Sequence, residues 1–198
     1  MKKTLALILA LLLALSAFGA LAASKTITIN KKSFPDKNFR RLVKGVDYDF
    51  NGNGKLTSSE IKKIDWVEVT SCDISDLTGI KYFPNLYGIT AGDNHLKKLD
   101  VSKNTKLKRL ILCKNDLTKI TLGTQKQLVV LDCSGNNKLK KLDIGKCKKL
   151  LTIFKKGKKV KKNGYVEWHT GKDPDENYLR IPTKCKLYNG KKVLYKGK

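Results

Sequence analysis

The sequence has few of the residues on which catalysis usually depends. Its 198 residues include two histidines, His95 and His169, and neither lies in a motif typical of a metal site or a catalytic triad. No glycine-rich stretch has the spacing of a phosphate-binding loop. A Cys–His hydrolase would need one histidine beside Cys113, Cys147 or Cys185, which the sequence alone leaves open. We therefore expect a protein without enzymatic activity.

Arginine and acidic residues are also scarce. Lysine and arginine together number 42 against 17 aspartates and glutamates, which gives a formal net charge of +25. The arginines are Arg40, Arg41, Arg109 and Arg180. Arginine reads phosphates and base edges in a bidentate manner better than lysine does. This balance argues against specific nucleic-acid recognition and favours diffuse attraction to anions.

Long apolar runs are confined to the N-terminus. Lys2 and Lys3 precede an uninterrupted apolar stretch over residues 5–15, and small residues follow, with an A-x-A cleavage site at residues 20–22. This pattern predicts a secretory signal peptide over residues 1–22, with an uncleaved membrane anchor as the alternative. No other stretch approaches the roughly 20 apolar residues that span a bilayer. We expect a secreted or surface-associated protein with no membrane contact after cleavage.

The chain between residues 64 and 160 repeats itself every 21 or 22 residues. One turn reads Leu107-x-x-Leu110-x-Leu112-x-x-Asn115-x-Leu117. This is the leucine-rich-repeat pattern. The repeats cover residues 64–85, 86–106, 107–127 and 128–149, with a partial repeat at 150–160.

Stacked turns of this kind bury side chains that one turn cannot bury alone. The short x-Leu-x-Leu segments should pair as parallel strands. Two inward columns follow from the register: Ile64, Leu86, Leu107, Leu128, Leu150 and Val67, Ile89, Leu110, Leu131, Ile153. A third column, Asn94, Asn115 and Asn136, should satisfy buried backbone groups, because an asparagine side chain both donates and accepts. The far side of each turn should be extended or 3₁₀.

The expected fold class is an α/β solenoid. It would be a short horseshoe or right-handed superhelix with a parallel concave sheet, a helical EF-hand-like N-terminal cap over residues 23–63, and a β-rich C-terminal cap over residues 161–198. The fifth repeat decays, because Lys155 falls where an inward apolar residue belongs. The C-terminal segment contains a predicted hairpin on the Asn189-Gly190 turn. It would cover the open end of the sheet, or else form a glycan-binding unit using Trp168, Tyr178 and Tyr188.

A twelve-residue stretch in front of the repeats, residues 49–60, matches the EF-hand calcium loop. The expected Ca²⁺ ligands are Asp49, Asn51, Asn53, Lys55 through its carbonyl, Thr57 through a water, and Glu60. Gly54 would permit the sharp turn. A metal-free Gly/Asn turn is the alternative. With two carboxylates in the loop we expect weak affinity, on the order of 10⁻⁴ M.

Several segments carry a family resemblance. Phe34-Pro-Asp-Lys-Asn-Phe39, the loop just described, Ile74-Ser-Asp-Leu-Thr-Gly-Ile80 and Leu99-Asp-Val-Ser-Lys-Asn104 resemble the exported leucine-rich-repeat proteins of Gram-positive, often anaerobic, bacteria. The resemblance covers roughly residues 25–155. It implies a surface or secreted binding protein of internalin-like architecture without catalytic activity.

The outward residues of the strands form the first candidate binding surface. The expected ligand-binding residues are Trp66, Glu68, Thr90, Arg109, Ile111, Val130, Asp132 and Phe154. The apolar members would form an exposed strip, which a soluble monomer usually reserves for a partner. The partner would be a protein or glycan on a cell surface. Coverage of the strip by the caps or by self-association is the alternative, although we expect a monomer.

Lysines crowd the non-strand part of each turn and form the second candidate surface. The expected contacts to an anionic polymer are Lys97, Lys98, Lys119, Lys140, Lys141, Lys148 and Lys149. Teichoic acid, an acidic glycan or extracellular DNA would fit. The alternative is a solvated face that is rich in lysine through compositional bias.

The five cysteines are an odd number, so at least one cannot pair within the chain. Cys72 stands at the asparagine position of the first turn, and Cys133 stands in an inward column. We expect both to be buried thiols. The others occupy unrelated repeat positions, so no disulfide framework can be read. Free thiols in an exported protein indicate a habitat poor in oxygen.

Overall fold

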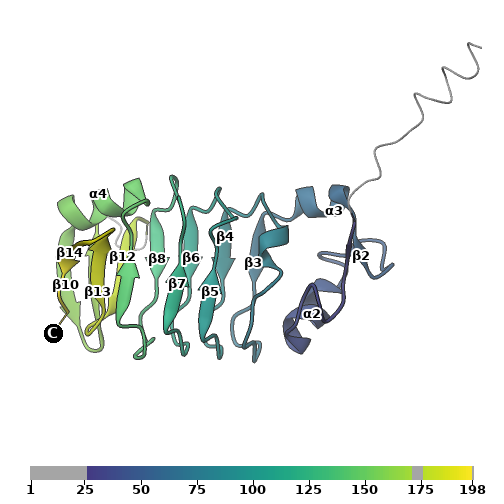
Figure 1. The fold of residues 1–198 in the computed structure, drawn as a ribbon, viewed down its shortest axis with the longest axis horizontal. Helices are drawn as coiled ribbons and strands as arrows, with labels where there is room; N and C mark the ends of the chain where they lie inside the picture. The colour runs from purple at the N-terminus through teal and green to yellow at the C-terminus, as the bar shows by residue number, and fades with distance from the viewer. Residues whose placement is uncertain (1–25, 171–175, 198) are drawn as a thin grey trace, which may run out of the picture.

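The computed structural model describes residues 26–170 and 176–197. The expected signal peptide therefore lies outside the described residues. The rest of the chain forms an elongated stack of coils with a helical cap at the N-terminal end (Figure 1). No helix in the described part is long and apolar enough to cross a membrane.

Each coil contributes a three-residue strand to one long sheet. These strands are β3 (Trp66–Glu68), β4 (Gly88–Thr90), β6 (Arg109–Ile111) and β8 (Val130–Asp132), and they pair in parallel. Their middle residues, Val67, Ile89, Leu110 and Leu131, are fully buried and lie opposite one another in the register. The predicted inward column and parallel sheet are confirmed.

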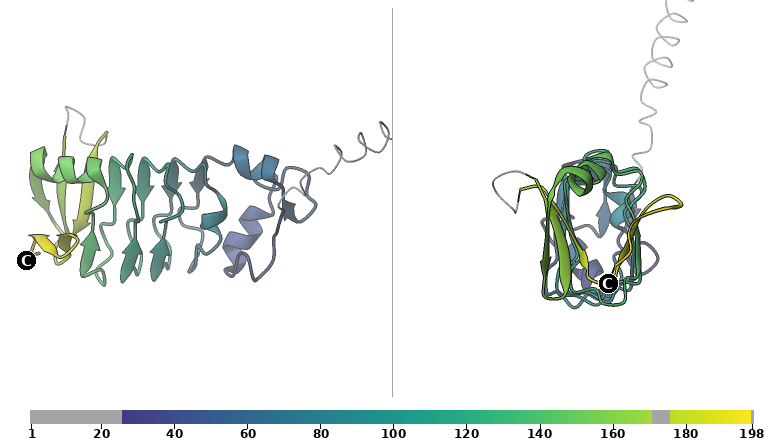
Figure 2. Two further views of the ribbon diagram at one scale, coloured as in Figure 1. Left: turned by 45° about the horizontal axis from the view of Figure 1, so that its top comes forward. Right: turned by 90° about the vertical axis from the view of Figure 1, so that its left-hand side faces the viewer.

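The opposite side of each coil is also extended. It holds β5 (Lys98–Asp100), β7 (Lys119–Thr121) and β9 (Lys141–Asp143), while the first coil has the 3₁₀ helix η1 (Ile80–Tyr82) there. The two sides face each other across the core, and the coil is nearly rectangular end-on (Figure 2). The coils stack in an almost straight row, which lacks the curvature of a horseshoe, one of the two expected shapes of the solenoid (Figure 1). In the coils that hold β4 to β9, both sides are three-residue strands, so successive coils are spaced equally on the two sides and the stack does not curve.

The asparagine column satisfies the backbone where each coil leaves the long sheet. Asn115 Nδ2 donates to the carbonyls of Ala91 at 2.8 Å, Leu112 at 3.2 Å and Cys113 at 3.2 Å, and its Oδ1 accepts from the Leu96 amide at 2.9 Å. Asn94 and Asn136 repeat this arrangement in their own coils. The predicted role of this column is confirmed.

A second amide column, which the sequence reading missed, lies at another corner. Asn104 Nδ2 donates to the Ile80 and Phe83 carbonyls, each at 2.9 Å. One coil later, Gln125 Nε2 donates to Val101 and Leu122, each at 2.8 Å. The two side chains are fully buried and 21 positions apart. The column is not apparent from the sequence, because its two positions carry different residue types, Asn and Gln.

The fifth strand expected at residues 150–160 does not form. The segment is instead the helix α4 (Lys148–Lys156), with Leu150 and Ile153 buried on one face. Leu150 and Ile153 are three residues apart, a spacing that fits one face of a helix as well as it fits the repeat. The lysines at both ends of the segment lie on the polar side of the helix. The predicted continuation of the inward columns in strand form is therefore wrong.

The fifth coil is supplied from further along the chain. β12 (Tyr178–Pro182) pairs in parallel with β8, and β13 (Lys186–Asn189) pairs in parallel with β9. Leu179 and Leu187 are fully buried opposite Leu131 and Leu142. Residues 178–189 thus continue both sheets by one turn. The C-terminal module is part of the solenoid and extends it.

Antiparallel strands finish both sheets. β10 (Lys158–Lys162) and β11 (Tyr165–His169) extend the long sheet, whose order is β10-β11-β12-β8-β6-β4-β3. β14 (Lys192–Tyr195) pairs with β13. The outermost strand β10 exposes four lysines. Charged side chains of this kind discourage another chain from pairing with a free edge.

The N-terminal cap joins the first coil through Asp36. Its Oδ1 caps α2 (Lys37–Val43) by accepting from the Asn38 and Phe39 amides, each at 2.9 Å. Its Oδ2 accepts from both the amide and the hydroxyl of Ser75, each at 2.9 Å. Burial raises the pKa of this carboxyl, but the hydrogen bonds together lower it by more than burial raises it. The pKa of Asp36 is therefore below its ordinary value. One ionised side chain therefore fixes the cap to the repeats.

Replacing Asn115 with alanine should destabilise the protein by about 3 kcal/mol. The substitution leaves the Leu96 amide and the Ala91 carbonyl without their partner, and each buried unpaired group costs about 1–3 kcal/mol. Urea denaturation measures the change in the free energy of unfolding. The exposed Asn137→Ala is the matched control and should change it by less than about 0.5 kcal/mol. Equal stabilities of the two variants would contradict the role of the column.

Candidate calcium loop and binding faces

The loop at residues 49–60 lies between α2 and α3 (Ser58–Lys63) and turns its side-chain oxygens inward. Asp49, 1 % exposed, accepts from the amides of Asn53 at 3.1 Å and Gly54 at 2.8 Å. Asn51 Oδ1 accepts from the Asn53 amide at 3.0 Å, and Asn53 Oδ1 accepts from the Lys55 amide at 2.9 Å. Gly54 has a φ of +76°, a conformation that glycine adopts without strain.

Glu60 closes the loop and combines burial with an unsatisfied oxygen. Its Oε2 accepts from the Thr57 amide and hydroxyl, each at 2.7 Å, in a capping box at the start of α3. Its Oε1 is buried without a hydrogen-bond partner among the described residues. Burial raises the pKa of Glu60, hydrogen bonds led by those from Thr57 lower it, and the net pKa is lowered. A buried, ionised carboxylate with a free oxygen suits a hard cation.

The remaining ligands would have to be neutral oxygens. In the described segments, no group of three or more His, Cys, Asp or Glu side chains could hold a metal. The loop offers two carboxylates, Asp49 and Glu60, together with the amide oxygens of Asn51 and Asn53 and the carbonyl of Lys55. Calcium accepts such mixed oxygen donors. The residues present therefore fit a weak calcium site.

The loop also has a strand partner. β2 (Lys55–Leu56) pairs antiparallel with β1 (Ile27–Thr28). The Ile29 amide donates to the Gly54 carbonyl at 2.9 Å. Leu56 is fully buried. The N-terminal strand thus holds the second half of the loop in place.

The outer face of the long sheet is open over its N-terminal half. The Trp66 ring lies over Gly88, where an added Cβ would come within 2.1 Å of it. The ring packs edge-on against Tyr87, with centroids 5.0 Å apart, and Tyr87 is 41 % exposed. Arg109 and Ile111 follow on β6, both half-buried. The sequence did not predict Tyr87 as a site residue, because it lies before the strand, where the repeat pattern does not specify whether a side chain points inward or outward.

The C-terminal half of that face is closed, which corrects the expected apolar strip. Val130 is fully buried and Asp132 is 6 % exposed. Their register partners on β12 are Tyr178 and Arg180. Phe154 lies on α4 rather than on a strand and packs against the Trp168 ring at 5.2 Å. The expected apolar strip does not form, because Val130 and Asp132 lie beside Tyr178 and Arg180 of β12 and are buried there.

Arg180 is the centre of a polar cluster on this closed half. Its Nε donates to Glu167 Oε2, and its Nη1 donates to Asp132 Oδ2 at 3.4 Å. Its guanidinium carbon lies 4.1 Å from the Tyr178 ring centroid. Trp168 and Tyr178 are 3 % and 4 % exposed. Of the three rings expected in a glycan-binding unit, Trp168 and Tyr178 are therefore inaccessible, and Tyr188 is half-buried.

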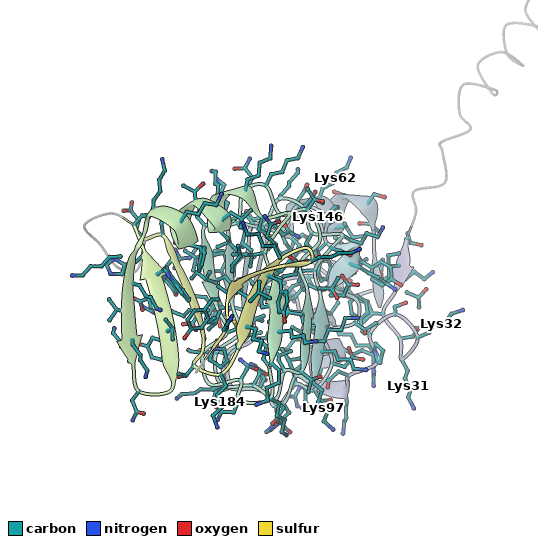
Figure 3. The ribbon with its side chains drawn as sticks, turned by 60° about the vertical axis from the view of Figure 1, so that its left-hand side comes forward. Lys31, Lys32, Lys62, Lys97, Lys146 and Lys184 are labelled. Atoms are coloured by element: carbon teal, nitrogen blue, oxygen red, sulfur yellow. The ribbon has the colours of Figure 1, made fainter. Side chains whose placement is uncertain are left out.

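Five of the lysines expected to bind anions lie on or just before the strands of one side of the solenoid, and two lie at the start of α4. Lys98, Lys119 and Lys141 take the same place on β5, β7 and β9. Lys97 and Lys140 immediately precede two of them. Lys148 and Lys149 begin α4. Lys97 and Lys184 project from one edge, and Lys62 and Lys146 project from the other (Figure 3). The seven residues therefore do not form one surface.

The cysteines are free thiols, and most of them are buried. Burial raises the pKa of the Cys147 thiol to about 11 and that of Cys185 to about 12, and it raises the pKa of Cys113 as well. These values disfavour a thiolate nucleophile at neutral pH. His95 is exposed and pairs with Asp73 at 3.1 Å. The geometry offers no activated Cys–His pair among the described residues.

Comparisons with known proteins support the fold. No protein-family model matches the chain, and no curated protein matches it. The functional domain of InlJ from Listeria monocytogenes is similar, with 26 % identity, a TM-score of 0.56, and coverage of 64 % of this chain and 28 % of that chain. InlF, an internalin from the same organism, has 20 % identity, a TM-score of 0.42, and coverage of 61 % and 39 %. The likeness to InlJ shows an internalin-like leucine-rich-repeat fold, over less than a third of that protein's length.

The solved InlJ domain is described as including a cysteine ladder. The cysteines described in this chain do not form one. Cys72 stands in the asparagine column, Cys133 in an inward column beside Leu112, and Cys147 in the corner column of Asn104 and Gln125. Cys113 and Cys185 lie elsewhere. Here amide side chains fill the corners.

Proposed function

We propose that the protein is an exported, non-catalytic binding protein that recognises a protein or glycan on a cell surface. Recognition uses the open half of the long sheet. We name this surface the aromatic patch, formed by Trp66, Tyr87, Thr90, Arg109 and Ile111. Its central observation is the edge-on contact between the half-buried Trp66 ring on β3 and the exposed Tyr87 ring just before β4.

The composition and rigidity of the aromatic patch support this role. Tryptophan, tyrosine and arginine are the residue types most enriched among binding hot spots. Trp66 is held in place, because Gly88 leaves room for its ring and Tyr87 packs against its side. A preorganised side chain loses little conformational entropy on binding. Glu68, which accepts from the Thr70 amide and hydroxyl, borders the patch with one negative charge.

The closed half of the sheet is excluded from this role. Val130 and Asp132 are buried, and Phe154 packs into the C-terminal module. Of the eight ligand-binding residues expected from the sequence, five remain candidates: Trp66, Glu68, Thr90, Arg109 and Ile111.

Tyr87→Lys should weaken binding at least about tenfold, since hot-spot substitutions cost about 2 kcal/mol or more. Val193→Lys is the matched control, because Val193 is 42 % exposed against 41 % for Tyr87 and lies on the distant strand β14. The measurement is binding of labelled protein to a glycan array and to intact cells, before and after protease treatment of the cells. Equal binding by the two variants would contradict the aromatic patch.

We also propose that calcium binds the loop at residues 49–60 and stabilises the N-terminal cap. The unpaired, buried Glu60 Oε1 supports this role. Glu60 lies in the first turn of the helix that leads into β3, and Asp49 is held by the Gly54 amide across the loop. When bound, the ion would neutralise two carboxylates that are both buried. Its effect would therefore be on stability at the N-terminal end of the repeats.

Calcium at about a hundred times its dissociation constant should raise the melting temperature by roughly 5–10 °C, from a stabilisation of about 2.7 kcal/mol. Differential scanning calorimetry with calcium and with chelator measures this shift. Glu60→Gln should abolish it, whereas Glu68→Gln, an exposed neighbour, should preserve it. Coincident melts of the unsubstituted protein in calcium and chelator would exclude the site.

A further inference from the structure

We propose that the side of the solenoid opposite the aromatic patch, where the two short sheets β5-β7 and β9-β13-β14 lie, binds a flexible phosphodiester polymer without nucleobases, laid across the strands along the solenoid axis. The contact surface is a row of four lysines that we name the lysine track: Lys98, Lys119, Lys141 and Lys186. This surface lies on the other side of the molecule from the aromatic patch, so the proposal stands independently of the function proposed above.

Strand register aligns the four lysines in two pairs, and the repeat aligns the pairs with each other, because Lys119 and Lys141 begin the corresponding strands of successive coils. Lys98 pairs with Lys119 between β5 and β7, and Lys141 pairs with Lys186 between β9 and β13. β7 and β9 lie in successive coils (Figure 1). Neighbouring strands are about 4.8 Å apart, so the row spans roughly 14 Å. Lys186 comes from the fifth coil, which is why sequence reasoning could not place it with the others.

The charges of the track are exposed and free of ion pairs within the described residues. Lys97, Lys140 and Lys184 lie just before the track strands and strengthen the positive potential on that side. Four like charges held a few ångströms apart repel one another. A polyanion along the row would relieve that repulsion.

The track is narrow because acidic residues border it. Asp100 and Asp143 lie two residues further along their strands. Asp100 Oδ1 accepts from the Ser102 amide at 2.9 Å, and Asp143 Oδ1 accepts from the amides of Gly145 at 2.8 Å and Gly190 at 3.1 Å. Their negative charges repel an anionic ligand that extends beyond the row. A thin single chain fits this border better than a duplex does.

A groove continues the track at its N-terminal end. The first coil has η1 where the next coils have strands, and a cavity of about 280 Å³ lies between residues 76–81 and β5. Lys81, Lys98 and Lys103 line it together with Thr78, Ser102 and the carboxylates Asp76 and Asp100. A polymer chain that passes Lys98 would therefore meet two further ammonium groups and two hydroxyls, with the two carboxylates limiting how deeply it enters.

The side-chain chemistry of the track selects among polyanions. Lysine is a compact point charge that contacts a phosphate without fixed geometry, whereas arginine reads it bidentately. β5, β7 and β9 carry no aromatic side chain on which bases could stack, and Tyr188 on β13 is half-buried. Single-stranded nucleic-acid sites usually combine charge with such aromatic platforms. A polyol-phosphate chain needs only the charges.

The test compares two quadruple Lys→Gln variants that lose equal charge. One replaces Lys98, Lys119, Lys141 and Lys186. The other replaces four lysines away from the track, Lys106, Lys108, Lys126 and Lys146. Binding of synthetic poly(glycerol phosphate) is followed by fluorescence anisotropy over a salt series, and urea unfolding confirms that both variants are folded.

The track variant should bind about tenfold more weakly or worse, and its slope of log K against log salt should be shallower by roughly 3, from about 0.7 per neutralised phosphate. The control variant should change affinity by less than about twofold, as expected for lysines that make no direct phosphate contact. If both variants bind equally weakly, the loss of net charge alone explains the effect, and the proposal that the lysine track is the binding site is wrong. Tighter binding of oligo(dT) or polyuronate than of poly(glycerol phosphate) at equal charge concentration would overturn the ligand class, and absence of binding would overturn both.

Discussion

The structure depends on satisfying the backbone at the corners of each coil. A coil of 21 or 22 residues with two three-residue strands leaves most of its peptide groups in turns, and many of these groups face the core. Asn94, Asn115 and Asn136 give one corner of each coil an acceptor and an NH2 group with two donors, and they bind backbone of both their own coil and the preceding one. Each buried peptide group left without such a partner would cost about 1–3 kcal/mol, which offsets part of the gain from the leucine columns.

The same constraint governs the ends, where no further coil is available. At the N-terminus, Asp36 accepts hydrogen bonds from the amide and hydroxyl of Ser75, and so supplies the hydrogen-bond partner that a preceding coil would otherwise provide. At the C-terminus, β12 and β13 continue the two sheets. The half-buried Arg180 contacts buried carboxylates on β8 and β11, which holds β12 between them. A buried ion pair adds little net stability, but a mismatched one is costly, so this cluster fixes the register of the fifth coil.

Closing the C-terminal end also decides where ligands can bind. β12 takes away the outward face at Val130 and Asp132, so the open part of the long sheet is limited to the first coils. On the opposite sheet the same module adds Lys186 to a row of lysines. One structural element therefore shortens the candidate recognition surface and lengthens the candidate anion surface. The calcium loop lies at the other end, next to β3 (Figure 1).

Local and periodic features were predictable from the sequence, and long-range pairings were not. The repeat register identified the strands from Val67 to Leu131 and the role of Asn115, because each depends on neighbours 21 or 22 residues away. The helix α4 was missed because Leu150 and Ile153 are spaced as both motifs require. Arg180 and Lys186 were missed because their partners, Asp132 and Lys141, lie 48 and 45 residues away with no repeat connecting them.

Hydrogen exchange of the corner amides tests the central claim most directly. The amides of Ile74, Leu96 and Leu117 donate to asparagine Oδ1 atoms at 2.9, 2.9 and 3.0 Å, outside any strand or helix. If these bonds hold the coils together, the three amides should exchange as slowly as those of β4 and β6, through unfolding of the whole repeat array. Exchange at the rate of exposed turns would show that the coils stack without the asparagine column.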